Sequence, residues 1–199
     1  MAFRVQDFRS QMTYDGARPN LFQCSLTFPD GDGATEQKFS FMARASQLPG
    51  NTIGVAPQFY FGRELKFAGN RTFAEWTVTV VNDEDYKTRD EFESWMSGIN
   101  SHVGNRRQSN FIRGAPGYQA DGYIEAFGKQ GDVIKAYKFV GIFPIDLSPM
   151  EMDWGANDTI QEYTVTFAYQ WWEWDDGRNG PTTDKTGAGF IPDDGRIID

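Results

Sequence analysis

The chain has little of the residue chemistry that enzymes and metal proteins use. Its 199 residues include one cysteine and one histidine. His102 stands in a polar stretch without a second histidine or a cysteine, so a zinc site is not expected. No Walker, HExxH, GxSxG or GxGxxG pattern appears. We therefore expect no enzymatic activity, no cofactor and no metal. Cys24 cannot pair within the chain; we expect a small buried hydrophobe, with an intermolecular disulfide as the alternative.

Positive charge and long apolar runs are also scarce. The net charge is −9, whereas proteins that grip nucleic-acid phosphates carry a basic surface. A protein that nucleic acid passes without sticking remains compatible with this charge. No run of about 18 apolar residues predicts a membrane span, and the N-terminus shows no apolar signal-peptide region. We expect a soluble, cytosolically made chain.

Alternating apolar and polar residues dominate what is present, and they predict a mainly β domain. Hydrophobic content of 39% and aromatic content of 16% suffice for a sizeable core. The segment 72–81 is typical, with Ala74, Trp76, Val78 and Val80 on one face. The same pattern predicts strands at 20–28, 37–46, 58–68, 122–127, 132–140 and 159–172.

The segments between these strands carry turn and loop signals. Turn-forming residues at 29–33 predict that strands 20–28 and 37–46 form a hairpin. Two prolines and two glycines predict a loop or edge excursion at 47–57, and Gly69-Asn70 predicts a tight turn into the Trp76 strand. Residues 101–119 are expected to form a long polar loop.

One substantial helix is expected at 85–100. Its apolar residues Phe92, Trp95, Met96 and Ile99 follow at the spacing of one helical face. The acidic cluster at 82–85 precedes it and suits the unpaired N–H groups of a helix N-terminus. We predict one antiparallel β domain over residues 1–174. A Gly- and Asp-rich extension at 175–199 is expected to be flexible or to dock on a neighbouring subunit.

Several groups leave a chemical alternative open. The acidic cluster at 82–85 or the Asp/Gly turn at 30–33 could hold a metal, although capping and turn formation explain them better. Glu125 and Glu162 are candidates for a carboxylate pair only by elimination. Trp171, Trp172 and Trp174 alternate poorly, so at least one is expected to face outward, as at a protein interface or a sugar platform.

The ordered set of these segments resembles one family. Residues 48–100 contain an LPG loop, a Gly62-Arg63 pair, a strand centred on Trp76, an acidic turn and a helix around Trp95. Further on come YKFVGIFP at 137–144, MDW at 152–154 and EYTVTFAY at 162–169. In this order, over about residues 2–174, the chain is similar to tail tube proteins of contractile-tailed bacteriophages, which are related to the tubes of type VI secretion and bacteriocin particles.

The resemblance implies a fold, a location and partners. It implies a β-sandwich or partial barrel with one helix, six copies of which close into a large β-barrel ring. Rings would stack into the virion's inner tail tube, assembled in the host cytoplasm, as the conduit for DNA ejection. Sheath, baseplate and tail terminator proteins would be partners. The tape measure protein and genomic DNA would pass through the lumen without specific binding. The alternatives are a monomeric carbohydrate-binding or virion-decorating module and the tube of a DNA-free contractile injection particle.

Three sets of residues are predicted to act in assembly. Uncharged, partly apolar residues of the 47–57 segment are expected to contact the adjacent ring: Leu48, Pro49, Gly50, Ile53 and Val55. A basic stretch is expected to face acidic groups of another subunit or the sheath: Arg106, Arg107 and Arg113. The polar face of the last strand is expected to line the lumen, with its aromatic face in the core: Glu162, Thr164, Thr166 and Gln170.

Overall fold

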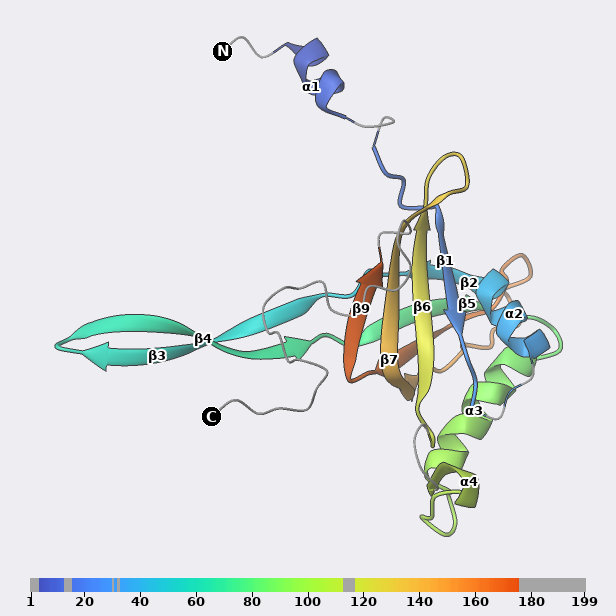
Figure 1. Ribbon diagram of the computed structural model, residues 1–199. Helices are drawn as coiled ribbons and strands as arrows, with labels where there is room; N and C mark the ends of the chain where they lie inside the picture. The colour runs from blue at the N-terminus through green and yellow to red at the C-terminus, as the bar shows by residue number, and fades with distance from the viewer. Residues whose placement is uncertain (1–3, 13–15, 30, 32, 113–116, 176–199) are drawn as a thin grey trace, which may run out of the picture.

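The computed structural model describes residues 4–12, 16–29, 31, 33–112 and 117–175 (Figure 1). The helices are α1 Val5–Gln11, α2 Gly33–Met42, α3 Lys87–Ile99 and α4 Ser109–Ile112. The first strands are β1 Phe22–Leu26, β2 Ala43–Ser46, β3 Asn51–Tyr60, β4 Arg63–Phe73 and β5 Trp76–Val81. The later strands are β6 Ala120–Phe127, β7 Val133–Leu147, β8 Glu162–Ala168 and β9 Trp171–Asp175.

The predicted mainly β, antiparallel architecture is confirmed. The main sheet has the strand order β1-β6-β7-β8-β5-β2, with β9 also paired to β7, and every described pairing is antiparallel. Strand β7 joins two halves of this sheet: residues up to Ile142 pair with β6, and residues from Phe143 pair with β8. Gly141 lies at this changeover with φ +66°, a conformation that side chains resist, so glycine permits the bend. Edge strands β1 and β2 form no ladder with each other in the described residues, so one chain is not a closed barrel.

The core lies where the concave sheet meets α3. Trp76 is 1% exposed and stacks on Phe139, with ring centroids 4.4 Å apart. Phe92 of α3 is buried against Phe167 of β8, with centroids 5.8 Å apart. Burial of each such side chain stabilises the fold by roughly 1.5–3 kcal/mol. Cys24 is fully buried in the same cluster, as expected, and burial raises the pKa of its thiol to about 11.

The predicted helix at 85–100 is confirmed as α3. Phe92 and Trp95 are buried, and the indole N–H of Trp95 donates to the carbonyl oxygen of Tyr118 at 2.8 Å. The acidic cluster contributes to the N-terminus through Asp85, whose Oδ1 accepts the backbone N–H of Lys87 at 3.2 Å. The N-cap residue itself is Tyr86, at φ 53°, and it makes no side-chain cap bond.

The predicted hairpin of 20–28 with 37–46 is wrong. Residues 33–42 form α2, and β1 pairs instead with β6. Phe39 and Phe41 share a face only in a strand; in this helix Phe39 is fully buried and Phe41 is 74% exposed. Only residues 43–46 form a strand, β2, which pairs with β5. A buried contact favours the helix, because Phe39 packs edge-on against both Phe28 and Phe92.

Of the two structures predicted at 47–57, a loop or an edge excursion, the loop is wrong for most of its length. From Asn51 onward the chain is β3, which pairs with β4 along nine registered positions. The turn lies at Phe61-Gly62, while Gly69-Asn70 continues β4. The hairpin reaches away from the main sheet, so its backbone hydrogen bonds are its own (Figure 1). The glycines at 54 and 69 allow close approach across the ladder, because an added Cβ at Gly69 would lie 3.1 Å from the backbone of Gly54.

Smaller differences concern the second half of the chain. The expected loop at 101–119 contains α4, which buries Phe111. The expected strand at 159–172 is divided: β8 ends at Ala168, and β9 pairs with β7. Helix α1 was not expected from the sequence, and it projects from the body (Figure 1). Residues 176–199, for which a flexible or docking extension was predicted, lie outside the described residues.

Candidate functional site

The hairpin β3–β4 is exposed on both faces. Every residue of β3, and every residue of β4 except Phe73, is exposed. Paired residues share a face, so Val55 with Ala68 and Phe59 with Glu64 lie on one side. Ala56 with Phe67 and Gln58 with Leu65 lie on the other. Apolar side chains therefore face water on both sides. A lone two-stranded ribbon is marginal in water, so contact with another surface would stabilise this hairpin.

The predicted ring-stacking residues lie in this hairpin and in the segment before it. Ile53 and Val55 are in β3, and both are exposed. Leu48 and Gly50 are exposed in the preceding segment, where Pro49 is half-buried. The backbone N–H of Ala74 donates to the carbonyl oxygen of Gly50, which anchors the base of the hairpin. The sequence reasoning located the apolar residues but missed the strand that presents them.

The polar face of β8 forms one surface with β5. Thr164 pairs with Thr79, and Thr166 pairs with Thr77. These threonines are half-buried, while Tyr163, Val165 and Phe167 on the other face are buried, as the alternation predicts. Glu162 forms an ion pair with Arg44 of β2, so its charge is neutralised locally. Gln170 lies outside β8, in the connection to β9, where its backbone N–H donates to the carbonyl oxygen of Val140.

Two of the three predicted basic residues are described. Arg106 and Arg107 are exposed in the segment between α3 and α4, and Arg113 lies outside the described residues. The guanidinium of Arg107 lies 4.4 Å from the ring centroid of Tyr118, a cation–π contact. Among the described residues, neither arginine forms an ion pair.

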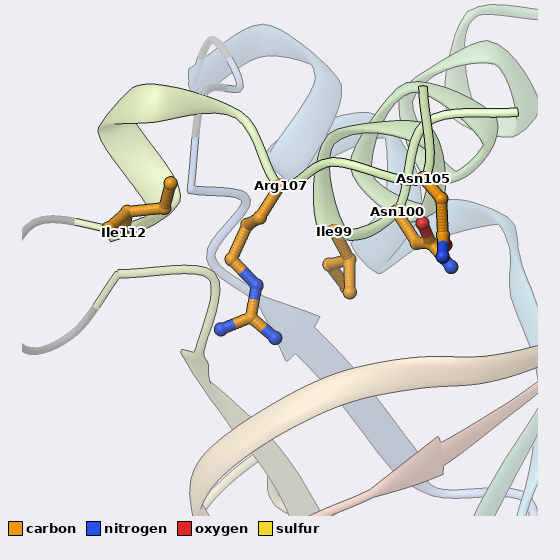
Figure 2. A pocket seen from close by; sticks show the side chains of 5 residues that line it. All are labelled: Ile99, Asn100, Asn105, Arg107 and Ile112. Carbon is orange, nitrogen blue, oxygen red and sulfur yellow. The ribbon is translucent and has the colours of Figure 1, made fainter. Parts of the chain in front are cut away.

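A shallow surface pocket of about 460 Å³ adjoins Arg107 (Figure 2). Figure 2 shows its other lining residues: Ile99, Asn100, Asn105 and Ile112. Apolar walls with one guanidinium and two amides can accept a partly apolar, acidic side chain. The pocket has no nucleophile or general base among these residues.

The acidic cluster before α3 holds a lysine that sequence reasoning missed. Lys38 Nζ lies 2.8 Å from Asp83 Oδ2 and 2.5 Å from Asp85 Oδ1. Hydrogen bonding to Lys38 lowers the pKa values of both carboxyls, and the two carboxylates raise the pKa of Lys38. The sequence does not place Lys38 near this cluster, because the alternation of residues 37–46 predicts a strand. In the described part of the chain no group of three or more His, Cys, Asp or Glu residues could hold a metal ion.

The tryptophans near the end of the described chain are only partly available. Trp171 is exposed, Trp172 is half-buried, and the ring of Trp174 lies 3.3 Å from Lys135 Nζ. Trp172 packs edge-on against Tyr137 and Phe73. Such packing fits a structural role better than a flat sugar platform. No helix in the described residues has the length and apolar character needed to cross a membrane.

Known proteins resemble this chain in sequence along most of its length. A family model described as phage tail tube protein matches residues 17–175. Tail tube protein gp19 of Enterobacteria phage T4 is 32% identical over 161 residues, covering 80% of this chain and 92% of that protein. The tail tube protein of Serratia phage KSP90 is 25% identical over 169 residues, covering 83% of this chain and 93% of that protein.

Solved structures share the fold at low sequence identity. A chain of the anti-feeding prophage baseplate has a TM-score of 0.61 at 13% identity, covering 82% of this chain and 97% of that chain. A chain of the sheath–tube complex of an extracellular contractile injection system, PVC, has a TM-score of 0.58 at 12% identity. That match covers 88% of this chain and 99% of the other.

Proposed function

Because this chain belongs to the phage tail tube protein family, we propose that it polymerises as stacked hexameric rings that form the inner tube of a contractile tail. The protein is a structural component of the virion tail, and its curated relatives are tail tube proteins rather than enzymes. The expected domain limits, residues 1–174, are part of that proposal.

The exposed hairpin β3–β4 carries the proposal. Its apolar side chains are exposed to water on both faces, and burying them would stabilise the hairpin. Contact with copies in the adjacent ring removes that surface from water. The proposed ring-stacking residues are Ile53 and Val55 in β3 and, before this strand, Leu48, Pro49 and Gly50.

Ring closure follows from the open sheet. Strand β2 is an edge strand in the described chain, and an unpaired edge offers N–H and C=O groups to another strand. Pairing of edges around six copies would join the sheets into one large barrel and remove them. The surface of β8 and β5 that carries Thr164 and Thr166 would then face the lumen, together with Glu162 at the start of β8 and Gln170 beyond its other end.

Partner assignments rest on charge and on the relatives. The structures that share this fold include a baseplate, a tube-terminating cap and a sheath–tube complex. We assign sheath, baseplate and terminator proteins as partners of this tube. We place Arg106, Arg107 and Arg113 against acidic groups of another subunit or the sheath. The tape measure protein and DNA would pass the lumen without specific binding, since the chain is acidic overall.

Electron microscopy and sedimentation of the purified chain at increasing concentration test the assembly. We expect six-fold rings, and then tubes, as the concentration rises. A matched variant, Ile53→Ser with Val55→Ser, should still form rings but should stack poorly. A single monomer species at every concentration, together with binding to glycans, would instead support the carbohydrate-binding module.

A further inference from the structure

The tip of the hairpin combines backbone strain with an exposed aromatic ring. Phe61 has φ 45° and Gly62 has φ 79°, so the turn needs two left-handed residues. Asn, Asp or Gly adopt this conformation readily in such turns, whereas a bulky residue there is strained. Phe61 is nevertheless 91% exposed, and its ring contacts only Tyr60 among the described rings, with centroids 4.5 Å apart. Strain that brings no intramolecular burial points to a role in binding.

A second group of exposed apolar residues lies close together in sequence, in the segment between β7 and β8. All residues from Glu151 to Ile160 are exposed, and they include Met152, Trp154 and Ile160. The Trp154 side chain is completely exposed. The segment has a defined local form, because Asp153 Oδ1 accepts the N–H of Gly155 at 2.9 Å and the Gln161 amide approaches the Met152 sulfur at 3.0 Å.

The hairpin as a whole and the β7–β8 connection carry opposite net charge. Strands β3 and β4 hold three basic residues, Arg63, Lys66 and Arg71, against the single acidic Glu64. Residues 148–161 hold Glu151, Asp153 and Asp158 and no basic residue. In the described part of the chain none of the three basic residues forms an ion pair, and the three acidic ones form none either. Charge complementarity of this kind sets the register and orientation of a contact.

The two clusters also lie at opposite ends of the subunit. In Figure 1 the hairpin reaches out to the left of the main sheet, while the orange connection between β7 and β8 lies to the right. One hairpin strand of ten residues spans roughly 33 Å at the rise of a β-strand. A copy displaced along the hairpin direction therefore presents its β7–β8 connection to the tip. Contacts between different surfaces of identical chains are head-to-tail, and they propagate as an open stack when the displacement between copies does not close into a ring.

We propose that the hairpin tip of one copy, with Phe61 as its anchor, docks on the Met152–Trp154–Ile160 cluster of a copy in the next ring. The proposal rests on the stacked tube proposed above and names the surface that receives the hairpin. The aromatic tip packs on Trp154 and its apolar neighbours. Arg63 and Lys66 project from opposite faces of the hairpin near its tip, so they lie on either side of it against Glu151 and Asp158 of the receiving copy.

Disulfide trapping tests this contact in assembled tubes. The double variant Phe61→Cys with Trp154→Cys should give, under mild oxidation, a ladder of covalent oligomers beyond the dimer on a non-reducing gel. Each single variant should stop at dimers or remain uncrosslinked. Background from Cys24 should be low, because it is fully buried and its pKa is raised to about 11. The matched control Phe61→Cys with Ile112→Cys places the second thiol on exposed α4 and should give no ladder.

The trapping experiment distinguishes failure of the docking contact from failure of the proposed tube assembly. Tubes of the double variant that give no ladder above the controls would overturn the docking contact and leave the tube intact. Failure of the unmodified chain to form rings or tubes would instead overturn the proposed function.

If the cysteine variants fail to assemble, charge reversal tests the same contact between the hairpin tip and the acidic segment. Arg63→Glu with Lys66→Glu should abolish stacking, and adding Glu151→Lys with Asp158→Lys should restore it. Asp153 is left unchanged because its carboxylate holds the local turn. Absence of restoration, with rings still formed, would exclude the acidic segment as the receiver.

Discussion

Lys38 Nζ lies 2.5 Å from Asp85 Oδ1, and this contact ties α2 to the segment that starts α3. Asp83 accepts from the same ammonium group at 2.8 Å. One lysine therefore holds together two carboxylates that would otherwise repel each other. The acidic cluster thus has a structural explanation in this chain: it joins two helices over the core and supplies an acceptor to the first turn of α3.

The stabilisation from this cluster should depend on pH in a defined window. The carboxyl pKa values are lowered from 3.8, so their contribution is present above that value and is lost as pH falls through the folded-state pKa. The Lys38 pKa is raised from 10.5, so its contribution is lost as pH rises through the higher folded-state value. Lys38→Met should lower Tm between about pH 4 and 10, and the difference from the parent should shrink outside that window.

The control for this pH series is Lys87→Met. Lys87 Nζ lies 3.9 Å from Asp85 and is largely exposed, so its removal should change Tm little. Thermal unfolding followed by circular dichroism over the pH series compares all three chains. Equal Tm differences for the two variants at every pH would contradict the assigned role of Lys38.

The parts of the fold that the sequence predicted well are those with one buried face. In β5 and β8 the core accepts alternate residues only, so the pattern around Trp76 and Val165 predicts both strand and orientation. In α3 the Phe92–Trp95 spacing does the same for a helix. These segments also carried the family resemblance.

The mispredicted segments either have no buried face or have a sequence that is compatible with both a strand and a helix. Residues 37–42 alternate like a strand, and long-range contacts of Phe39 with Phe28 and Phe92 decide for the helix. The hairpin β3–β4 has no buried face, so the order of its apolar and polar residues does not indicate which side faces a core. Its prolines and glycines favour a loop instead. Its pairing is set by the turn at Phe61-Gly62, a pair that lacks the usual Asn-Gly signature.

Trp76 is expected to dominate core stability. It is almost fully buried, stacks on Phe139, and donates its indole N–H to Ser46 Oγ at 2.9 Å. Trp76→Ala should cost about 3–5 kcal/mol of unfolding free energy in urea denaturation. The control Trp154→Ala removes a fully exposed indole and should change it by about 0.5 kcal/mol or less. Similar losses for both variants would contradict the burial assigned to these residues.

The hairpin tip should respond oppositely in the free subunit and in the tube. Phe61→Asn replaces a strained residue with one that favours the left-handed turn, so the unfolding free energy of the free subunit should stay equal or rise slightly. Tube length measured by electron microscopy should fall, because the aromatic anchor is lost. Loss of both subunit stability and stacking would mean that Phe61 acts within the subunit.

The arginines beside the α3–α4 pocket should act through charge. Arg106→Glu with Arg107→Glu reverses two exposed charges and also removes the contact of Arg107 with Tyr118. Assembly should weaken and become more sensitive to salt, because close packing of acidic chains needs local complementarity. A second variant, Arg107→Lys, keeps the charge and should retain most assembly. Sedimentation across a salt series compares the three chains, and identical profiles would remove these arginines from the interface.

The lumen assignment predicts that added positive charge will retain DNA. Thr164 lies on the polar face of β8 opposite Thr79, two residues from Glu162 on the same face. Because Glu162 is already paired with Arg44, a lysine at 164 adds a net positive charge to this surface. Duplex DNA carries about one negative charge per 1.7 Å of axis, so a lysine repeated in every subunit would meet phosphates throughout the tube. Thr164→Lys should permit assembly, make empty tubes retain added DNA at low salt, and slow delivery by particles.

The control variant Thr164→Gln has similar bulk without charge and should behave like the parent. Raising the salt concentration should release the retained DNA, since the attraction is electrostatic. Lysine-bearing tubes that hold no more DNA than the glutamine variant would place this face of β8 outside the lumen.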